Sequence, residues 1–111
     1  MKIVVLLFTA LLFCFSSLAQ NVTVLNTFSC GRYVESRVRS DAVPSVWILG
    51  FLSGANVFNQ RKIDILQTID RESILLWMDK RCKDNPLEYV EDGAALLMQE
   101  LAQKALERNK K

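Results

Sequence analysis

The chain has 111 residues, the size of a single domain, and half of them are apolar, which excludes a disordered protein. Its formal net charge is +2 at pH 7. The charges are spread along the sequence, and only Arg108 to Lys111 form a small basic tail, so the charge pattern gives no reason to expect nucleic-acid binding.

The first 19 residues have the pattern of a secretory signal peptide. Lys2 supplies a positive start, residues 3–15 are an apolar core that includes Cys14, and Ser17-Leu18-Ala19 is a small-x-small end. The apolar run is shorter than the about 20 residues that a membrane helix needs. We therefore predict cleavage after Ala19, export to the periplasm or beyond, no stable membrane insertion, and one domain over residues 20–111. The alternative is an uncleaved anchor.

Two cysteines, Cys30 and Cys82, remain in the mature chain. An even count in an oxidising compartment predicts an intramolecular disulfide. The bond would close a loop of about 53 residues and stabilise the fold by roughly 4 kcal/mol in the chain-entropy treatment. Two free thiols and a bridge between two chains are the alternatives.

Helix signals begin near residue 28. Ser29 is a candidate N-cap for a short helix over residues 28–39, on which Tyr33 and Val34 face inward. Residues 20–27 alternate weakly between polar and apolar, which fits either an extended arm or a lead-in to this helix.

A second helix is predicted from Val43 to about Asn59, with Asp41 as its N-cap and Pro44 in its first turn. Apolar residues at positions 47, 48, 51, 52, 55 and 58 give it a wide apolar face, so we expect it to be central.

Gly50 and Gly54 lie four residues apart on one face of that helix, flanked by Trp47, Phe51 and Phe58. A glycine inside a helix costs about 1 kcal/mol relative to alanine, so two of them suggest that something packs closely against this strip. The first interpretation is another helix of the same domain. The second is a partner protein or a second copy of the chain.

Two further helices complete the predicted fold. One has Asp70 as its N-cap and ends near Lys83. The other is predicted from Pro86 to about Arg108, with Asn85 as its cap and Glu88 completing a capping box. Residues 59–68 connect the second helix to the third with uncertain structure. The fold class is therefore a small all-α bundle of about four helices, in which the disulfide ties the first helix to the third.

The residues of catalysis are largely missing. The chain has no histidine, which removes the commonest general base and metal ligand. It has no glycine-rich phosphate loop and no C-x-x-C motif. Caps and surface charges explain the carboxylates Asp64, Asp70, Asp79 and Asp84, although Asp79 could instead accept a buried hydrogen bond. We therefore predict no catalytic residue, no metal and no cofactor, and a binding or structural protein rather than an enzyme.

The order of several motifs resembles that of a known family. The motifs are C-G-x-Y from Cys30, W-x-x-G-F-x-S-G-x-N from Trp47, W-M-D-K-R-C from Trp77, N-P-L from Asn85 and A-x-x-L-x-x-E-L from Ala94. Together they look like the Rap/Tai group, small exported helical proteins best known as immunity proteins against type VI secretion amidase toxins. The resemblance implies that the motif and core residues are Trp47, Gly50, Phe51, Gly54, Asn56, Trp77, Asp79, Asn85 and Pro86.

Two positions depart from the pattern of that group. It more often has Gly-Tyr where this chain has Gly50-Phe51, and often has Tyr where this chain has Arg81. Either change could alter a partner surface without harming a helical core.

By resemblance, the folded protein would block the active cleft of a peptidoglycan amidase sterically. The expected contact surface is the polar connection after the central helix, with Asn59, Gln60, Arg61, Lys62 and Asp64. The simpler reading is that this loop is only solvated. A homodimer is compatible with the resemblance, and an exported domain with some other partner is a further alternative.

The layout is also similar to that of HdeA-type periplasmic acid chaperones, which gives the alternative function. Without histidine, no side chain with an ordinary pKa titrates between about pH 5 and 8. An acid switch would therefore depend on carboxylates that become protonated below about pH 5.

Overall fold

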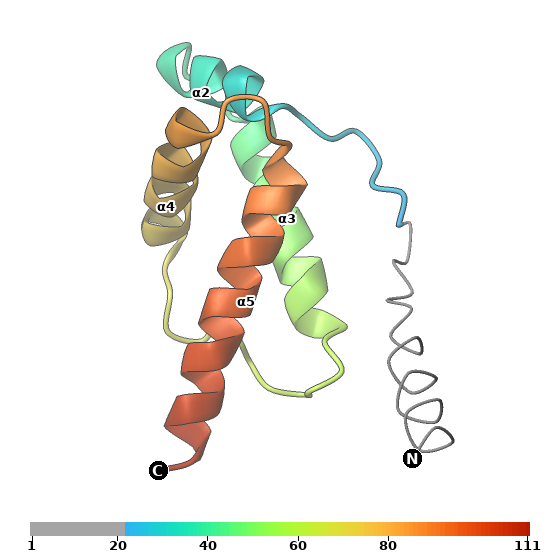
Figure 1. The fold of residues 1–111 in the computed structure, drawn as a ribbon, viewed down its shortest axis with the longest axis vertical. Helices are drawn as coiled ribbons and strands as arrows, with labels where there is room; N and C mark the ends of the chain where they lie inside the picture. The colour runs from blue at the N-terminus through green and yellow to red at the C-terminus, as the bar shows by residue number, and fades with distance from the viewer. Residues whose placement is uncertain (1–21) are drawn as a thin grey trace, which may run out of the picture.

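The computed structural model describes residues 22–111, which form four helices and no regular strand. The helices are α2 (Cys30–Val38), α3 (Val43–Val57), α4 (Arg71–Asp84) and α5 (Val90–Asn109). Figure 1 shows α3 and α5 running down the molecule, α4 running up beside α5, and α2 lying across the upper end. This arrangement confirms the predicted all-α bundle.

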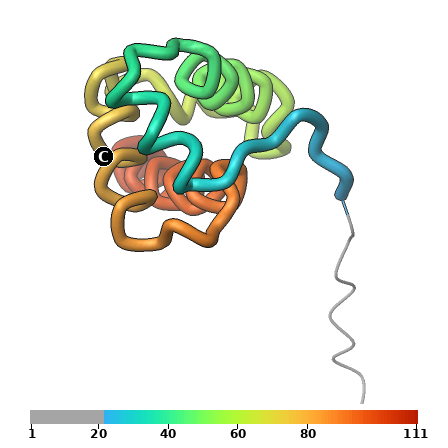
Figure 2. The backbone as a smooth tube through the Cα atoms, turned by 90° about the horizontal axis from the view of Figure 1, so that it is seen from above, coloured from blue at the N-terminus to red at the C-terminus, as the bar shows by residue number. Residues whose placement is uncertain are grey.

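The chain before α2 is an extended arm. Residues 22–28 leave the bundle without helix or strand, as Figure 2 shows in blue. The arm joins the body at its end, where Phe28 O accepts a hydrogen bond from Val90 N at 2.9 Å and Ser29 forms an isolated antiparallel bridge with Tyr89. Of the two alternatives for this segment, the structure has the arm. The predicted signal peptide, residues 1–19, lies outside the described residues.

Two of the predicted N-caps are confirmed, and one is displaced. Ser29 Oγ accepts from Arg32 N at 3.2 Å, and Asp70 Oδ1 accepts from Ser73 N at 2.7 Å. The N-cap of α3 is Ala42, so the assignment of Asp41 as N-cap is wrong by one residue. The Asp41 carboxylate still accepts from Val43 N at 3.0 Å, which keeps a negative charge at the start of the helix.

The predicted start of the last helix is wrong. Asn85 ends α4 instead, and its Nδ2 donates to Arg81 O at 3.0 Å, while α5 begins only at Val90. The reason is tertiary, because the segment from Pro86 to Glu88 pairs with the start of α2. Pro86 O accepts a hydrogen bond from Gly31 N at 3.0 Å, and Glu88 O accepts one from Cys30 N at 2.7 Å. Those bonds hold the segment outside a helix despite its capping-box pattern.

The core lies where the buried faces of the four helices meet. On α5 the buried residues recur every three or four positions: Val90, Ala94, Leu97, Leu101 and Ala105. Trp47 and Trp77 are half-buried and pack against the edge of the core, whereas Phe58 is 85% exposed and leaves the predicted apolar face of α3. The fully or nearly fully buried apolar residues include Tyr33, Ile48, Leu52, Leu75, Met78, Val90, Ala94 and Leu97.

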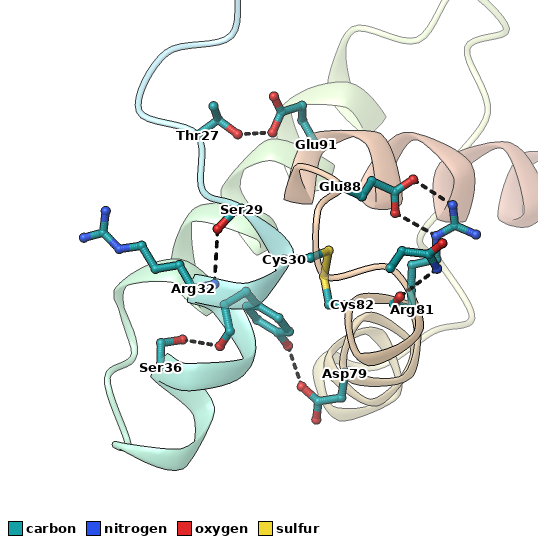
Figure 3. The surroundings of a disulfide bond; sticks show 12 residues. Thr27, Ser29, Cys30, Arg32, Ser36, Asp79, Arg81, Cys82, Glu88 and Glu91 are labelled. Carbon is teal, nitrogen blue, oxygen red and sulfur yellow. Dashed lines mark hydrogen bonds and ion pairs between the residues drawn. A yellow bond between two sulfur atoms is a disulfide. The ribbon is translucent and has the colours of Figure 1, made fainter.

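The predicted disulfide between Cys30 and Cys82 is present and ties α2 to α4. Both cysteines are completely buried. Figure 3 shows that polar side chains surround this bond, with Asp79 below it and the Arg81–Glu88 pair beside it. Arg81 donates to Glu88 through Nε at 2.8 Å and through its terminal nitrogen at 2.7 Å, which fastens α4 to the segment before α5.

Candidate functional site

The connection between α3 and α4 is a shaped loop, and the Asn56 side chain closes its base. From the last turn of α3, Asn56 Nδ2 donates to Asp64 Oδ1 at 2.9 Å, and its Oδ1 accepts from Ile65 N at 2.8 Å. One side chain therefore ties the helix end to the far side of the loop. The resemblance singled out Asn56 as a motif residue, and the structure gives it this positioning role.

A second asparagine holds the interior of the loop. Asn59 Nδ2 donates to Ile63 O at 3.0 Å and also to Asn56 O. The backbone turns at Lys62, whose φ of 53° lies in the left-handed region that non-glycine residues seldom adopt. The two asparagines thus bind the far side of the loop at Ile63, Asp64 and Ile65, and Arg61 and Lys62 lie at the tip before these contacts.

The tip of the loop is positively charged. Arg61 and Lys62 are adjacent and exposed, and neither takes part in an ion pair among the described residues. Asp64, the nearest acidic residue in the loop, has its carboxylate engaged by Asn56. The predicted contact residues therefore comprise two exposed cations, the amide side chains of Asn59 and Gln60, and the exposed carboxylate of Asp64.

A groove of about 410 Å³ runs between this loop and α5. Its walls hold amide side chains and one cation over an apolar floor that includes Ile65 and Ala102, and they include no acidic residue. Such a groove offers hydrogen-bond donors to the carbonyls or carboxylates of a partner chain. Its lining residues are Asn59, Gln60, Arg61, Ile65, Met98, Gln99, Ala102 and Gln103.

The wall from α5 was not predicted from the sequence. Gln99 and Gln103 lie one turn apart on an exposed part of that helix, and nothing local distinguishes them from ordinary solvated residues. They join the loop only through the packing of α3 against α5.

The glycine strip of α3 is open. A Cβ atom built on Gly50 or on Gly54 would meet no atom within 4 Å, and Gly50 is exposed. The interpretation that another helix of the domain packs on the strip is therefore wrong for the described residues. The reason is that α3 buries its opposite face, which carries Ile48 and Leu52. A partner or a second copy on this face remains a prediction.

The aromatic residues beside the strip form their own cluster. Trp47 stacks on Phe51 with ring centroids 5.4 Å apart and meets Phe28 edge-on at 6.2 Å. This cluster closes the edge of the core near the arm, which gives Trp47 and Phe51 a packing role.

The motif residues around the disulfide also serve to hold the fold together. Asp79 accepts hydrogen bonds from Tyr33 and Arg37, which agrees with the alternative prediction that this carboxylate accepts a hydrogen bond within the fold. Pro86 O accepts a hydrogen bond from the start of α2. Trp77 packs at the core edge. These residues hold α2, α4 and α5 together and leave the loop and its groove as the candidate site.

Within residues 22–111, no three His, Cys, Asp or Glu side chains are grouped so that they could hold a metal ion. Across the same residues, no helix combines the length and the apolar character needed to cross a membrane. No protein-family model matches the chain, and neither a curated protein nor a solved structure matches it.

Proposed function

We propose that the protein is an exported, non-enzymatic binding protein of the immunity type, which neutralises a peptidoglycan amidase by occupying its active cleft. The observation that carries the proposal is the cationic loop at Arg61 and Lys62, whose base is held by the hydrogen bonds of Asn56. Steric inhibition requires a projection that keeps its shape when it enters a cleft, because ordering a flexible loop on binding weakens affinity.

The motif order supports the choice of an amidase as partner, as does the predicted signal peptide, which would place the protein where peptidoglycan lies. The groove beside the loop supports it further. Its donors suit the backbone carbonyls and carboxylates that line the rim of a cleft that takes peptide substrates.

The test is binding and inhibition of the amidase encoded beside the gene, with residues 20–111 in the oxidised form. We expect tight binding that the Arg61→Glu/Lys62→Glu variant weakens at least tenfold by reversing both charges at the tip. Lys80→Glu/Lys83→Glu is the matched control, because these two exposed cations lie on α4 near the disulfide, at the other end of the helix from the loop. Absence of binding to any neighbouring amidase, or equal effects of the two variants, would count against the proposal.

The acid-chaperone alternative is favoured by one observation. The link between α4 and the segment before α5, Arg81–Glu88, ends on a carboxylate, and acid below the lowered pKa of Glu88 removes its charge. Light scattering and a hydrophobic dye at pH 7 and about pH 2.5 separate the two functions. If the particle becomes smaller in acid, binds the dye and suppresses the aggregation of client proteins, the chaperone is favoured. A particle of constant size that binds no dye would favour the immunity protein.

A further inference from the structure

The groove between the loop and α5 has polar walls and an apolar floor, and these limit what it can bind. Gln99 and Gln103 form the exposed polar part of the α5 wall, and Gln60 and Arg61 form that of the loop wall. Ile65 is a buried residue of the floor. The volume of about 410 Å³ lies in the lower part of the range of binding pockets, about 300–1,000 Å³, so the groove has room for a short segment of chain rather than for a folded domain.

The two glutamines on α5 have a spacing that matches an extended peptide. Gln99 and Gln103 are four residues apart, which separates their Cα atoms by about 6 Å along the helix axis. In an extended chain, alternate residues repeat about every 6.6 Å and turn their backbone N–H and C=O groups toward the same side. A glutamine amide has both donors and an acceptor, so it can bond to both groups of one residue. The pair can therefore bind two alternate residues of a segment that lies along α5.

The charges around the groove favour a segment that is acidic. Arg61 lines the groove and takes part in no ion pair among the described residues. Asp64 and Glu100 are neighbours of lining residues in the sequence, but neither lines the groove. Their carboxylates are engaged by Asn56 and Lys104, at 2.9 Å in each case. The guanidinium of Arg61 is therefore available to a carboxylate that a partner supplies, and a basic segment would be repelled.

We infer that the groove receives an extended, acidic segment of a protein partner, whose backbone is bound by Gln99 and Gln103 and whose carboxylate pairs with Arg61. An apolar side chain of the segment lies on the floor at Ile65, because the side chains of an extended chain alternate between its two faces. The inference deepens the proposed function and rests on it for the identity of the partner: the loop enters the cleft of the amidase, and a segment from the rim of that cleft lies in the groove.

The test is an NMR titration of residues 20–111, oxidised and at pH 7, with a hexapeptide of alternating alanine and glutamate that is acetylated and amidated at its ends. We expect shifts of amide signals at the groove, with a dissociation constant of about 1 mM that rises with salt. The same peptide with lysine in place of glutamate should bind at least tenfold more weakly. Two further peptides, N-methylated at the alanines or at the glutamates, keep the charge but lose backbone N–H groups, and at least one of them should bind more weakly.

Variants of the protein test the assigned residues. Gln99→Ala/Gln103→Ala should weaken peptide binding at least tenfold, and Arg61→Gln should weaken it and remove most of its dependence on salt. Glu100→Ala/Lys104→Ala is the matched control, because it makes two alanine substitutions at the same spacing on the same helix, at exposed positions outside the groove. Alanine favours a helix, so both double variants should keep the fold, which circular dichroism checks.

Three results would overturn the inference: no shifts at the groove, equal binding of the lysine peptide or of both methylated peptides, or equal effects of the two double variants. The titration needs no amidase, so the two proposals fail separately. A protein that inhibits an amidase but does not bind the peptide contradicts only the inference about the groove. A protein that binds the peptide but no amidase contradicts only the proposed function.

Discussion

The hydroxyl of Tyr33 on α2 donates a hydrogen bond to Asp79 Oδ1 on α4 at 2.8 Å, across 46 residues of chain. The same carboxylate accepts from Arg37 Nε at 3.0 Å and from its terminal nitrogen at 3.1 Å. One acidic side chain on α4 thus holds two residues of α2, a turn away from the disulfide that joins the same two helices. The covalent and the polar links together fix α2 across the end of the bundle.

The first prediction concerns this hydroxyl. Tyr33→Phe should lower the free energy of unfolding by about 2 kcal/mol at pH 7, because it removes a buried hydrogen bond to a charged acceptor. Urea unfolding followed by circular dichroism measures the change. Tyr89→Phe is the control, since Tyr89 is half exposed, and it should have little effect. Equal effects of the two variants would contradict the role assigned to the Tyr33 hydroxyl.

The same hydroxyl predicts a dependence of stability on alkaline pH. Burial, and next the hydrogen bond to Asp79, raise the pKa of Tyr33 well above its ordinary value of 10.0. The folded state therefore keeps a proton that the unfolded state loses. The resulting stabilisation is fully present below pH 10 and is lost as the pH rises above it. The difference in unfolding free energy between the native protein and Tyr33→Phe should accordingly shrink between pH 9 and about pH 11.

Glu88 predicts the opposite dependence, in acid. The hydrogen bonds from Arg81 lower the pKa of Glu88 below its ordinary value of 4.5, so this carboxylate stabilises the fold above that pH. The stabilisation is lost as the pH falls from about 4.5 through the lower folded pKa. Glu88→Gln should cost about 1 kcal/mol at pH 7 and much less at pH 3. Glu107→Gln, at an exposed position without an ion pair among the described residues, is the control. A constant difference at both pH values would contradict the assignment.

The disulfide should supply a large part of the net stability. Cys30 and Cys82 are 52 residues apart, and closing a loop of that length is worth roughly 4 kcal/mol in the chain-entropy treatment. A domain of this size has only about 5–15 kcal/mol in total. The Cys30→Ala/Cys82→Ala variant should therefore unfold at a much lower urea concentration. Reductant should lower the midpoint of the native protein but not that of the variant, and an unchanged midpoint in both would contradict this estimate.

The sequence predicted those parts of the fold that local chemistry determines. Ser29 and Asp70 cap helices because a short polar side chain before a periodic apolar run is sufficient to satisfy the first free N–H groups. Cys30 and Cys82 paired as expected. The cap pattern at Asn85 predicted the wrong start for the last helix, because the backbone around Pro86 is hydrogen-bonded to the start of α2. No local pattern contains that information.

The candidate site was predictable only in part. The polar, charged tip at Arg61 and Lys62 is visible in the sequence as a break in apolar periodicity. The clamp by Asn56 and the wall from Gln103 are not, because each depends on how residues distant in the chain are placed by packing. The sequence also could not predict that the glycine strip is open, because it shows which residues a helix face carries but not what covers them.

The two contrasting glycines give the last prediction. At Gly50 a Cβ atom would meet nothing within 4 Å, whereas at Gly93 on α5 it would lie 3.2 Å from Met78 Cε and 3.4 Å from Arg81 Cγ. Alanine favours a helix interior over glycine by about 1 kcal/mol. Gly50→Ala should therefore raise the free energy of unfolding by about that amount, and Gly93→Ala should gain less, because Met78 has to shift. Urea unfolding checks both, and an equal or larger gain at Gly93 would contradict the close contact of that position with Met78.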